Sequence, residues 1–186
     1  MEIPNSAGAA GRRTFIGRAI LVFSISIGIT IVDQIVKAWI VGHIPLDTVG
    51  IRLWNDFLWI VHTRNLGIAF SIGDSISHLF RIGFFIVLPL AFLVAAFIFC
   101  IRSDSLGGFQ RISIAIVAGG GLGNLVDRIF RPEGVVDFIS FSLYGIFGFD
   151  RFPTFNVADL CISVGACLVV ISGLFPGRGG NDVQRH

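Results

Sequence analysis

The sequence predicts an all-α polytopic membrane protein with four transmembrane helices, and two observations carry this prediction. Of the 186 residues, 54% are hydrophobic and only 14% are charged, whereas a soluble domain carries about 25% charged residues. Uncharged apolar stretches occur four times, at 19–32, 82–101, 112–126 and 160–176. The length fits one integral membrane domain over residues 1–186, with disordered tails expected at about 1–11 and 177–186.

The spans become long enough only if they carry charged residues into the membrane. A helix needs about 20 residues to cross the hydrocarbon core, and only the stretch 82–101 has that length without a charge. Each of the other three must include the charged residues at its end, which are Asp33 and Lys37, Asp127 and Arg128, and Asp159. Because embedded polar residues usually face the bundle interior or a watery cavity, they are candidates for a functional site.

The arginines before the first span predict that both termini are cytoplasmic. Arg12, Arg13 and Arg18 precede this span, and the flank of the first helix usually sets the orientation. No small-residue cleavage site follows the apolar run, so we expect a retained span and not a removed signal peptide. Four spans return the C-terminus to the cytoplasm. The embedded polar residues then all meet near the outer surface, which predicts a polar pocket opening toward the outer leaflet.

Two segments are expected on the outer side of the membrane. Residues 42–70 contain GIRLWNDFLWIVHTRN, in which strand-forming residues flank Asn55 and Asp56. This pattern predicts a small extracytoplasmic β-hairpin or sheet. Residues 129–155 are rich in aromatic residues, which favour the headgroup layer, so we expect an interfacial loop that could act as a lid.

Several classes of function are disfavoured by composition and spacing. The formal net charge is only +2 and no dense Lys/Arg cluster occurs, so we expect no nucleic-acid partner. The three cysteines lie in apolar runs without a C-x-x-C pair, which argues against a disulfide framework and a zinc site. The four histidines lack metal-ligand spacing. No serine or cysteine nucleophile motif stands out. We therefore expect neither a metal nor another cofactor.

Three of the embedded carboxylates have plausible structural roles. Asp33 and Lys37 are four residues apart, so they share a helix face, and an ion pair is favoured over direct chemistry. Asp127 has Arg128 as a neighbour and is interpreted as a structural, ionised residue. Asp159 follows Asn156 by three residues, and this spacing fits a capping box at a helix N-terminus as well as it fits catalysis.

Asp137 has no such structural explanation. No basic residue lies within four positions, and apolar residues flank it on both sides in GVVDFISF. Two carboxyl groups in a low dielectric share one proton, so that one can act as general base on a water while the other donates to a carbonyl. Asp137 and Asp159 are the best candidates for such a pair. Since they are 22 positions apart, only the tertiary fold can bring them together.

Five motifs follow one another along the chain: DQIVK at 33–37, NLGIAF at 65–70, GGGLGNLVDR at 119–128, VVDF at 135–138 and FNVAD at 155–159. In this order they resemble the lipoprotein signal peptidases, also called signal peptidase II, a family of aspartic membrane peptidases. The resemblance implies an aspartic endopeptidase of the bacterial inner membrane. It would remove the signal peptide from diacylglyceryl-modified prolipoproteins by cutting before the lipidated cysteine.

The resemblance also implies roles for individual residues. Asp137 and Asp159 would be catalytic. The residues expected to bind substrate or support the site are Asp33, Lys37, Asn65, Gly67, Asn124, Asp127, Arg128, Asn156 and Ala158. Expected partners are lipid-modified prolipoproteins, membrane lipids and globomycin-type peptide inhibitors.

Two other functions use the same sequence features. A small proton-coupled transporter would also need embedded carboxylates, but it predicts polar residues along a path across the bilayer. A non-enzymatic assembly factor would pack through Gly119 and Gly123, a small-xxx-small pair that lets helices approach closely. Such a factor would tolerate Asp137→Asn, because packing does not need ionisation.

Overall fold

The computed structural model describes residues 6–67 and 78–174, and its helices confirm the four predicted spans. The helices long and apolar enough to cross a membrane cover Gly11–His43, Gly83–Arg102, Gly108–Phe130 and Val157–Leu174. They belong to α1 (Ser6–His43), to a π-helical turn (Gly83–Val87) that continues as α3 (Leu88–Arg102), to α4 (Gly108–Phe130) and to α5 (Val157–Leu174). A short helix, α2 (His78–Ile82), precedes the π-helical turn.

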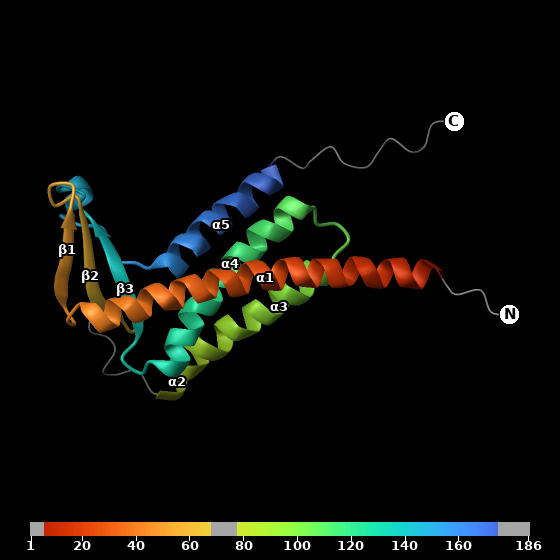
Figure 1. Cartoon of the computed structure of the whole chain (residues 1–186), viewed down its shortest axis with the longest axis horizontal. Helices are drawn as coiled ribbons and strands as arrows, with labels where there is room; N and C mark the ends of the chain where they lie inside the picture. Colours follow the sequence, from red (N-terminus) through yellow and green to blue (C-terminus); the bar gives the residue numbers. More distant parts are fainter. Residues whose placement is uncertain (1–5, 68–77, 175–186) are drawn as a thin grey trace.

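A small sheet lies at one end of the bundle, and α1 begins and α5 ends at the opposite end (Figure 1). The sheet has three antiparallel strands in the order β1-β2-β3: β1 (Thr48–Leu53), β2 (Leu58–Asn65) and β3 (Val135–Phe141). The predicted hairpin is therefore confirmed. Its turn contains Trp54, Asn55 and Asp56, which all have positive φ angles.

Strand β3 corrects our interpretation of residues 129–155 as a loop. Val136 and Phe138 are buried against Ile40 and Ile44 of α1. The side chain between them, Asp137, points to the other face of the strand and is also buried. Because both faces are covered, the strand lacks the alternation of polar and apolar residues that marks a half-buried strand. That missing alternation is why the sequence did not reveal it.

The aromatic residues after β3 are folded onto the sheet. Single antiparallel bridges join Ile139 to Phe155 and Ser142 to Arg151. Arg151 donates to the backbone oxygen of Ser140 at 2.8 Å and lies over the ring of Trp59, 3.7 Å from its centroid. In place of a free loop, this segment is fastened to the sheet by backbone and side-chain contacts.

Glycines on α4 bring the helices into close contact. A Cβ on Gly119 would lie 3.0 Å from the backbone of Ser26 in α1, and one on Gly120 would lie 2.4 Å from the carbonyl oxygen of Ala158 in α5. The glycine cluster therefore packs helices together, as the small-xxx-small pattern predicted. No Cβ could be accommodated at either position without moving a neighbouring helix.

The N-terminal segment corrects one expectation. Helix α1 begins at Ser6, so residues 6–11, for which we predicted disorder, are helical. The three alanines in SAGAAG favour a helix while its two glycines disfavour one, and the helix continues from this segment without a break into the first span. Residues 1–5, the C-terminal tail 177–186 and residues 68–70 of the NLGIAF motif lie outside the described residues.

Candidate active site

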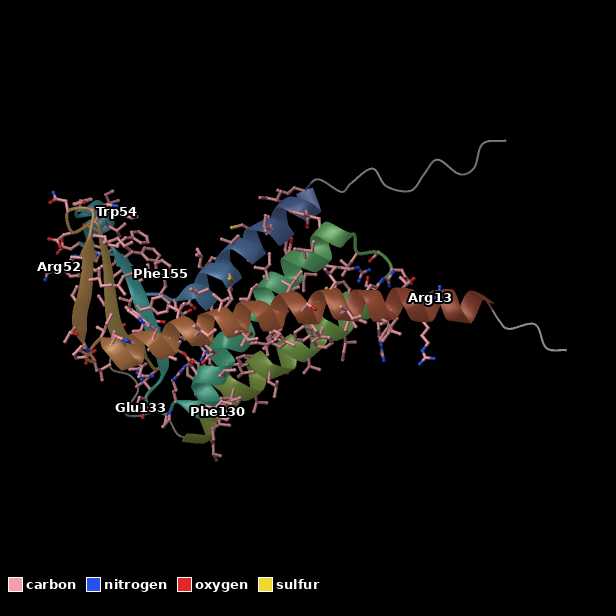
Figure 2. The ribbon with its side chains drawn as sticks, viewed as in Figure 1. Arg13, Arg52, Trp54, Phe130, Glu133 and Phe155 are labelled. Atoms are coloured by element: carbon pink, nitrogen blue, oxygen red, sulfur yellow. The ribbon has the colours of Figure 1, made fainter. Side chains whose placement is uncertain are left out.

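The side chains singled out from the sequence gather where the sheet meets the bundle. Figure 2 shows Phe130 at the end of α4 and Glu133 in the following turn, both beside this junction. Five elements supply the site: α1, β2, α4, β3 and the N-terminus of α5. Four of these residues, Asp33, Lys37, Asp127 and Asn156, have no exposed surface, and Asp137 is 1% exposed.

Lys37 is the centre of a buried ionic cluster. Its Nζ lies 2.8 Å from Oδ2 of Asp33 and 2.9 Å from Oδ2 of Asp127, and it donates to Oδ1 of Asn124 at 3.1 Å. The ion pair predicted between Asp33 and Lys37 is confirmed. Because all three donors of the ammonium group have partners, the charge can be buried completely.

Asp127 is fully buried and has several partners, which differ from the one expected. Its Oδ2 accepts a bond from Lys37 and one from the backbone N–H of Val136 in β3 at 3.1 Å, and its Oδ1 accepts one from Gln34 at 2.9 Å. The arginine that pairs with it is Arg131, the residue directly after α4, and not Arg128. Asp127 therefore joins α1, α4 and β3.

Asp33 holds the N-terminus of α5 against α1. Its Oδ1 accepts a hydrogen bond from the backbone N–H of Ala158 at 3.0 Å, which is one of the unpaired donors at a helix start. A Cβ on Gly123 would lie 2.7 Å from Oδ2 of Asp33 and 3.3 Å from the methyl group of Ala158. The absence of a side chain at Gly123 and the small one at Ala158 are what let the carboxylate reach the helix end.

Asp159 forms the capping box that its spacing predicted. The backbone N–H of Asp159 donates to Oδ1 of Asn156 at 2.9 Å, and the backbone N–H of Asn156 donates back to Oδ2 of Asp159 at 3.2 Å. The other oxygen of Asp159, Oδ1, accepts from Nδ2 of Asn124 at 2.7 Å. The side chain remains partly exposed, so capping leaves it accessible to a reactant.

Asp137 lies between two amide groups that donate to its carboxyl oxygens. Nδ2 of Asn156 donates to Oδ1 at 2.7 Å, and Nδ2 of Asn65 donates to Oδ2 at 3.0 Å. Burial raises the pKa of Asp137 from its ordinary value of 3.8 to about 6; the two amide donors and Lys37 lower this pKa, and the nearby charge of Asp159 raises it. A carboxyl group with such a pKa can hold a proton close to neutral pH.

Neighbouring groups fix the orientation of each amide. The backbone N–H of Gly67 donates to Oδ1 of Asn65 at 2.8 Å, so the amide nitrogen of Asn65 faces Asp137. Gly67 has a φ of +78°, and a Cβ there would lie 2.7 Å from the ring of Phe85, which makes glycine the fitting residue. Lys37 fixes the orientation of Asn124 in the same way. It donates to Oδ1 of Asn124, so Nδ2 of Asn124 faces Asp159.

A cavity of about 370 Å³ opens beside this network. Its lining residues are Asn65, Leu66, Ile82, Phe85, Ile86, Arg128, Ile129, Arg131, Pro132 and Gly134. Arg128 lies over the ring of Phe85, 5.9 Å from its centroid. The cavity is apolar along the span that follows α2 and cationic along α4, and Asn65 connects it to Asp137.

Within residues 6–67 and 78–174, no three His, Cys, Asp or Glu side chains are grouped as a metal site would require. Asn156 links the carboxyl groups of Asp137 and Asp159, the two candidates from the sequence. The asparagine donates to one carboxyl group and forms the capping box with the other.

Comparisons with known proteins identify the family. The family model described as signal peptidase (SPase) II matches residues 25–175. The chain belongs to the signal peptidase II family. A lipoprotein signal peptidase of Borrelia hermsii is 38% identical over 172 residues, which cover 92% of this chain and 98% of the relative. One from Treponema pallidum is 39% identical over 144 residues, 77% of each protein.

Two solved structures share the fold of this chain. A structure described as a bacterial membrane enzyme determined by the in meso method at 1.9 Å resolution has a TM-score of 0.70 and 34% identity, with 86% of this chain and 94% of that chain covered. A second, at 2.3 Å resolution, has a TM-score of 0.69 and 30% identity, with 92% and 96% covered. The family implies a peptidase, and the four spans and small sheet agree with this fold.

Sequence reasoning missed three residues of this site. Gln34 donates to the backbone oxygen of Gly123 at 3.0 Å and to Asp127, and Arg131 donates to Gln34 at 3.0 Å. The hydroxyl of Thr63 donates to the backbone oxygen of Asp137 at 3.1 Å. The spacing of four between Asp127 and Arg131 could have revealed Arg131 as a site residue. Gln34 and Thr63 gave no signal, because their partners are distant in sequence.

Proposed function

We propose that this protein is an aspartic endopeptidase that removes the signal peptide from diacylglyceryl-modified prolipoproteins, cutting before the lipidated cysteine. Membership of the signal peptidase II family supports the substrate class. The observation that carries the chemistry is the pairing of a buried carboxyl of raised pKa, Asp137, with a partly exposed carboxylate at a helix N-terminus, Asp159. Such a pair can hold one proton between two carboxyl groups.

The two aspartates have different roles in the proposed mechanism. Asp159 is the general base, because the start of α5 and the amide of Asn124 stabilise negative charge on it. Asp137 carries the proton and donates a hydrogen bond to the scissile carbonyl oxygen. Asp159 takes a proton from the attacking water as the C–O bond forms. The developing oxyanion is stabilised by the proton of Asp137.

Collapse of the tetrahedral intermediate completes the reaction. The C–N bond breaks as Asp159 passes the proton to the leaving nitrogen, and Asp137 retains its own. The products are a signal peptide with a new C-terminal carboxylic acid, which releases its proton to solvent, and a lipoprotein that begins with the modified cysteine. The pair returns to its initial protonation state, so no cofactor enters the cycle.

The surrounding residues hold this pair in position. Asn65 and Asn156 orient Asp137, Asn124 orients Asp159, and Lys37 holds Asn124. These supporting amides keep a geometry that would otherwise be lost through side-chain rotation. Arg128 lines the cavity next to Asn65, and we propose that it contacts the substrate backbone there.

The orientation that we propose puts both termini in the cytoplasm of the bacterial inner membrane and the active site near the outer leaflet. Arg12, Arg13 and Arg18 lie at the end of the bundle away from the sheet, which the flanking-charge rule assigns to the cytoplasm. A lipid-anchored substrate then presents its scissile bond at the depth of the aspartates. Cyclic peptides of the globomycin type are expected to occupy the same cavity and compete with substrate.

The distribution of buried charge favours a peptidase over a transporter. Among the described residues, the buried charged side chains are Asp33, Lys37, Arg111, Asp127 and Asp137. All but Arg111 belong to the site described above. The guanidinium of Arg111 lies at the other end of α4 and donates to the backbone oxygens of Cys100, Ser103 and Leu106. A path of embedded charges across the bilayer, which a transporter predicts, does not connect them.

The test is incubation of the purified protein with a diacylglyceryl-modified prolipoprotein, followed by mass analysis of both products. We expect one cut directly before the modified cysteine, and no cleavage by Asp137→Asn. The unmodified precursor of the same sequence serves as the control and should be cut far more slowly. Cleavage elsewhere, or equal cleavage of the unmodified precursor, would refute the proposed substrate class.

A further inference from the structure

A second cavity lies at the other end of the bundle, between α1 and α3. Its volume is about 370 Å³, and six of its seven lining residues are apolar: Phe15, Phe23, Val94, Phe97, Ile98 and Ile101. Phe15, Phe23, Val94 and Ile98 are each 43–48% exposed, whereas Ile101 is 8% exposed. The cavity is therefore a groove with a buried floor that opens to the surroundings of the spans, which in a membrane are lipid.

Contacts between the helices hold the two sides of this groove in place. The rings of Phe23 and Phe97 are stacked with centroids 4.9 Å apart. Arg18 forms an ion pair of 2.7 Å with Asp104 in the loop after α3. These two contacts tie α1 to α3 at different heights, so the groove is formed before any ligand enters.

The seventh lining residue gives the groove a cationic end. Arg102 is the last residue of α3, and within the described part of the chain its side chain has neither an ion pair nor a hydrogen bond. Arg12 precedes Phe15 by three residues, so it lies on the same face of α1, one turn nearer the N-terminus. The acidic residue of the neighbouring loop, Asp104, is already paired with Arg18.

We propose that this groove binds an anionic phospholipid, with one acyl chain along the apolar wall and the phosphate between Arg12 and Arg102. Guanidinium groups pair well with phosphate oxygens, and basic pockets between spans are known to take anionic head groups. The leaflet is the one at the N-terminal end of α1, which is cytoplasmic in the orientation proposed above. A choline head group would bring a cation toward two guanidinium groups, so phosphatidylcholine should bind less well.

The test is native mass spectrometry of the full chain in detergent with added phosphatidylglycerol or phosphatidylcholine of the same acyl composition. We expect one retained phosphatidylglycerol and weaker retention of phosphatidylcholine. Arg102→Gln and Arg12→Gln should each reduce phosphatidylglycerol retention by roughly fivefold, because a basic residue near an anionic lipid contributes about 1 kcal/mol. Arg13→Gln is the matched control, since Arg13 has the same charge one position, or about 100°, around α1. The Arg13→Gln variant should retain as much phosphatidylglycerol as the unchanged protein.

Two further experiments test the contributions of the acyl chain and the head group to binding separately. Val94→Trp places a large ring in the groove while keeping both arginines, so it should abolish retention. Glycerol 1-phosphate, which has no acyl chains, should give no adduct. The proposal is overturned if phosphatidylcholine is retained as well as phosphatidylglycerol, if Arg102→Gln behaves like Arg13→Gln, or if glycerol 1-phosphate binds equally well.

Discussion

Replacing Lys37 by methionine removes the cation on which the buried cluster depends while keeping an apolar side chain of similar length. Asp127 would retain Arg131, Gln34 and the N–H of Val136. Asp33 would keep the N–H of Ala158 and a weak bond of 3.3 Å from Gln34, but no positive charge. Removing one partner of a buried pair typically costs about 3–5 kcal/mol. Because Asp127 remains compensated, we expect a loss at the lower end, about 3 kcal/mol.

Thermal unfolding in detergent measures this loss. For a chain of this size about 3 kcal/mol corresponds to a fall in Tm on the order of 10 °C. Asp33→Asn combined with Lys37→Met is the informative control, because the asparagine oxygen can still accept from Ala158 while the uncompensated charge is gone. The double variant should therefore be more stable than Lys37→Met alone. An unchanged Tm for Lys37→Met, or a double variant less stable than the single one, would refute the role assigned to the cluster.

Three further predictions concern the proton, the helix contact and the orientation. The raised pKa of Asp137 is about 6, and the proposed mechanism needs its proton, so kcat/KM should fall as pH rises through about 6. A kcat/KM that stays unchanged up to pH 9 would contradict this role. Gly120→Ala should destabilise the protein by about 1–3 kcal/mol, because its Cβ would lie 2.4 Å from a carbonyl oxygen. Gly28→Ala, whose Cβ would have no atom within 4 Å, should leave the stability unchanged. Equal Tm values for the two variants would refute the close contact. With the native cysteines replaced by alanine, Glu133→Cys should react with an impermeant thiol reagent in intact cells and Ser105→Cys should not; the reverse pattern would invert the orientation.

The spans and the hairpin were predictable because their signals are local. A long apolar run needs only its own length to indicate a span, and the turn at Asn55 and Asp56 lies between two runs of strand formers. Strand β3 was missed for a physical reason. It is covered by α1 on one face and by the asparagines around Asp137 on the other, so its pattern is nearly continuous and apolar.

Pairing within the site was predictable only where the partners share one helix. The Asp33–Lys37 pair and the capping box of Asn156 and Asp159 follow from spacings of four and three. By contrast, Lys37 and Asp127 are 90 positions apart, and only the packing of α1 on α4 brings them together. The choice of Arg131 over Arg128 depends on which side of α4 faces Gln34.

The same limit applies to the amides. The motifs named Asn65, Asn124 and Asn156, but no sequence pattern could say which carboxyl each would orient. Asn156 contacts Asp137 through its side chain and Asp159 through the capping box. The capping interpretation of Asp159 and the proposed catalytic one are therefore compatible, because one carboxylate can serve both.

The most direct test of the aspartate pair is a double-mutant comparison of turnover on the modified prolipoprotein. Asp137→Asn and Asp159→Asn keep side-chain volume but cannot exchange the required proton, so each should nearly abolish kcat. If the two act as one unit, the double variant should be little slower than either single variant. Asp127→Asn is the control for stability, and it should lower Tm at least as clearly as rate. Near-normal turnover by a folded Asp159→Asn would show that this residue only caps α5, and would contradict the proposed pair.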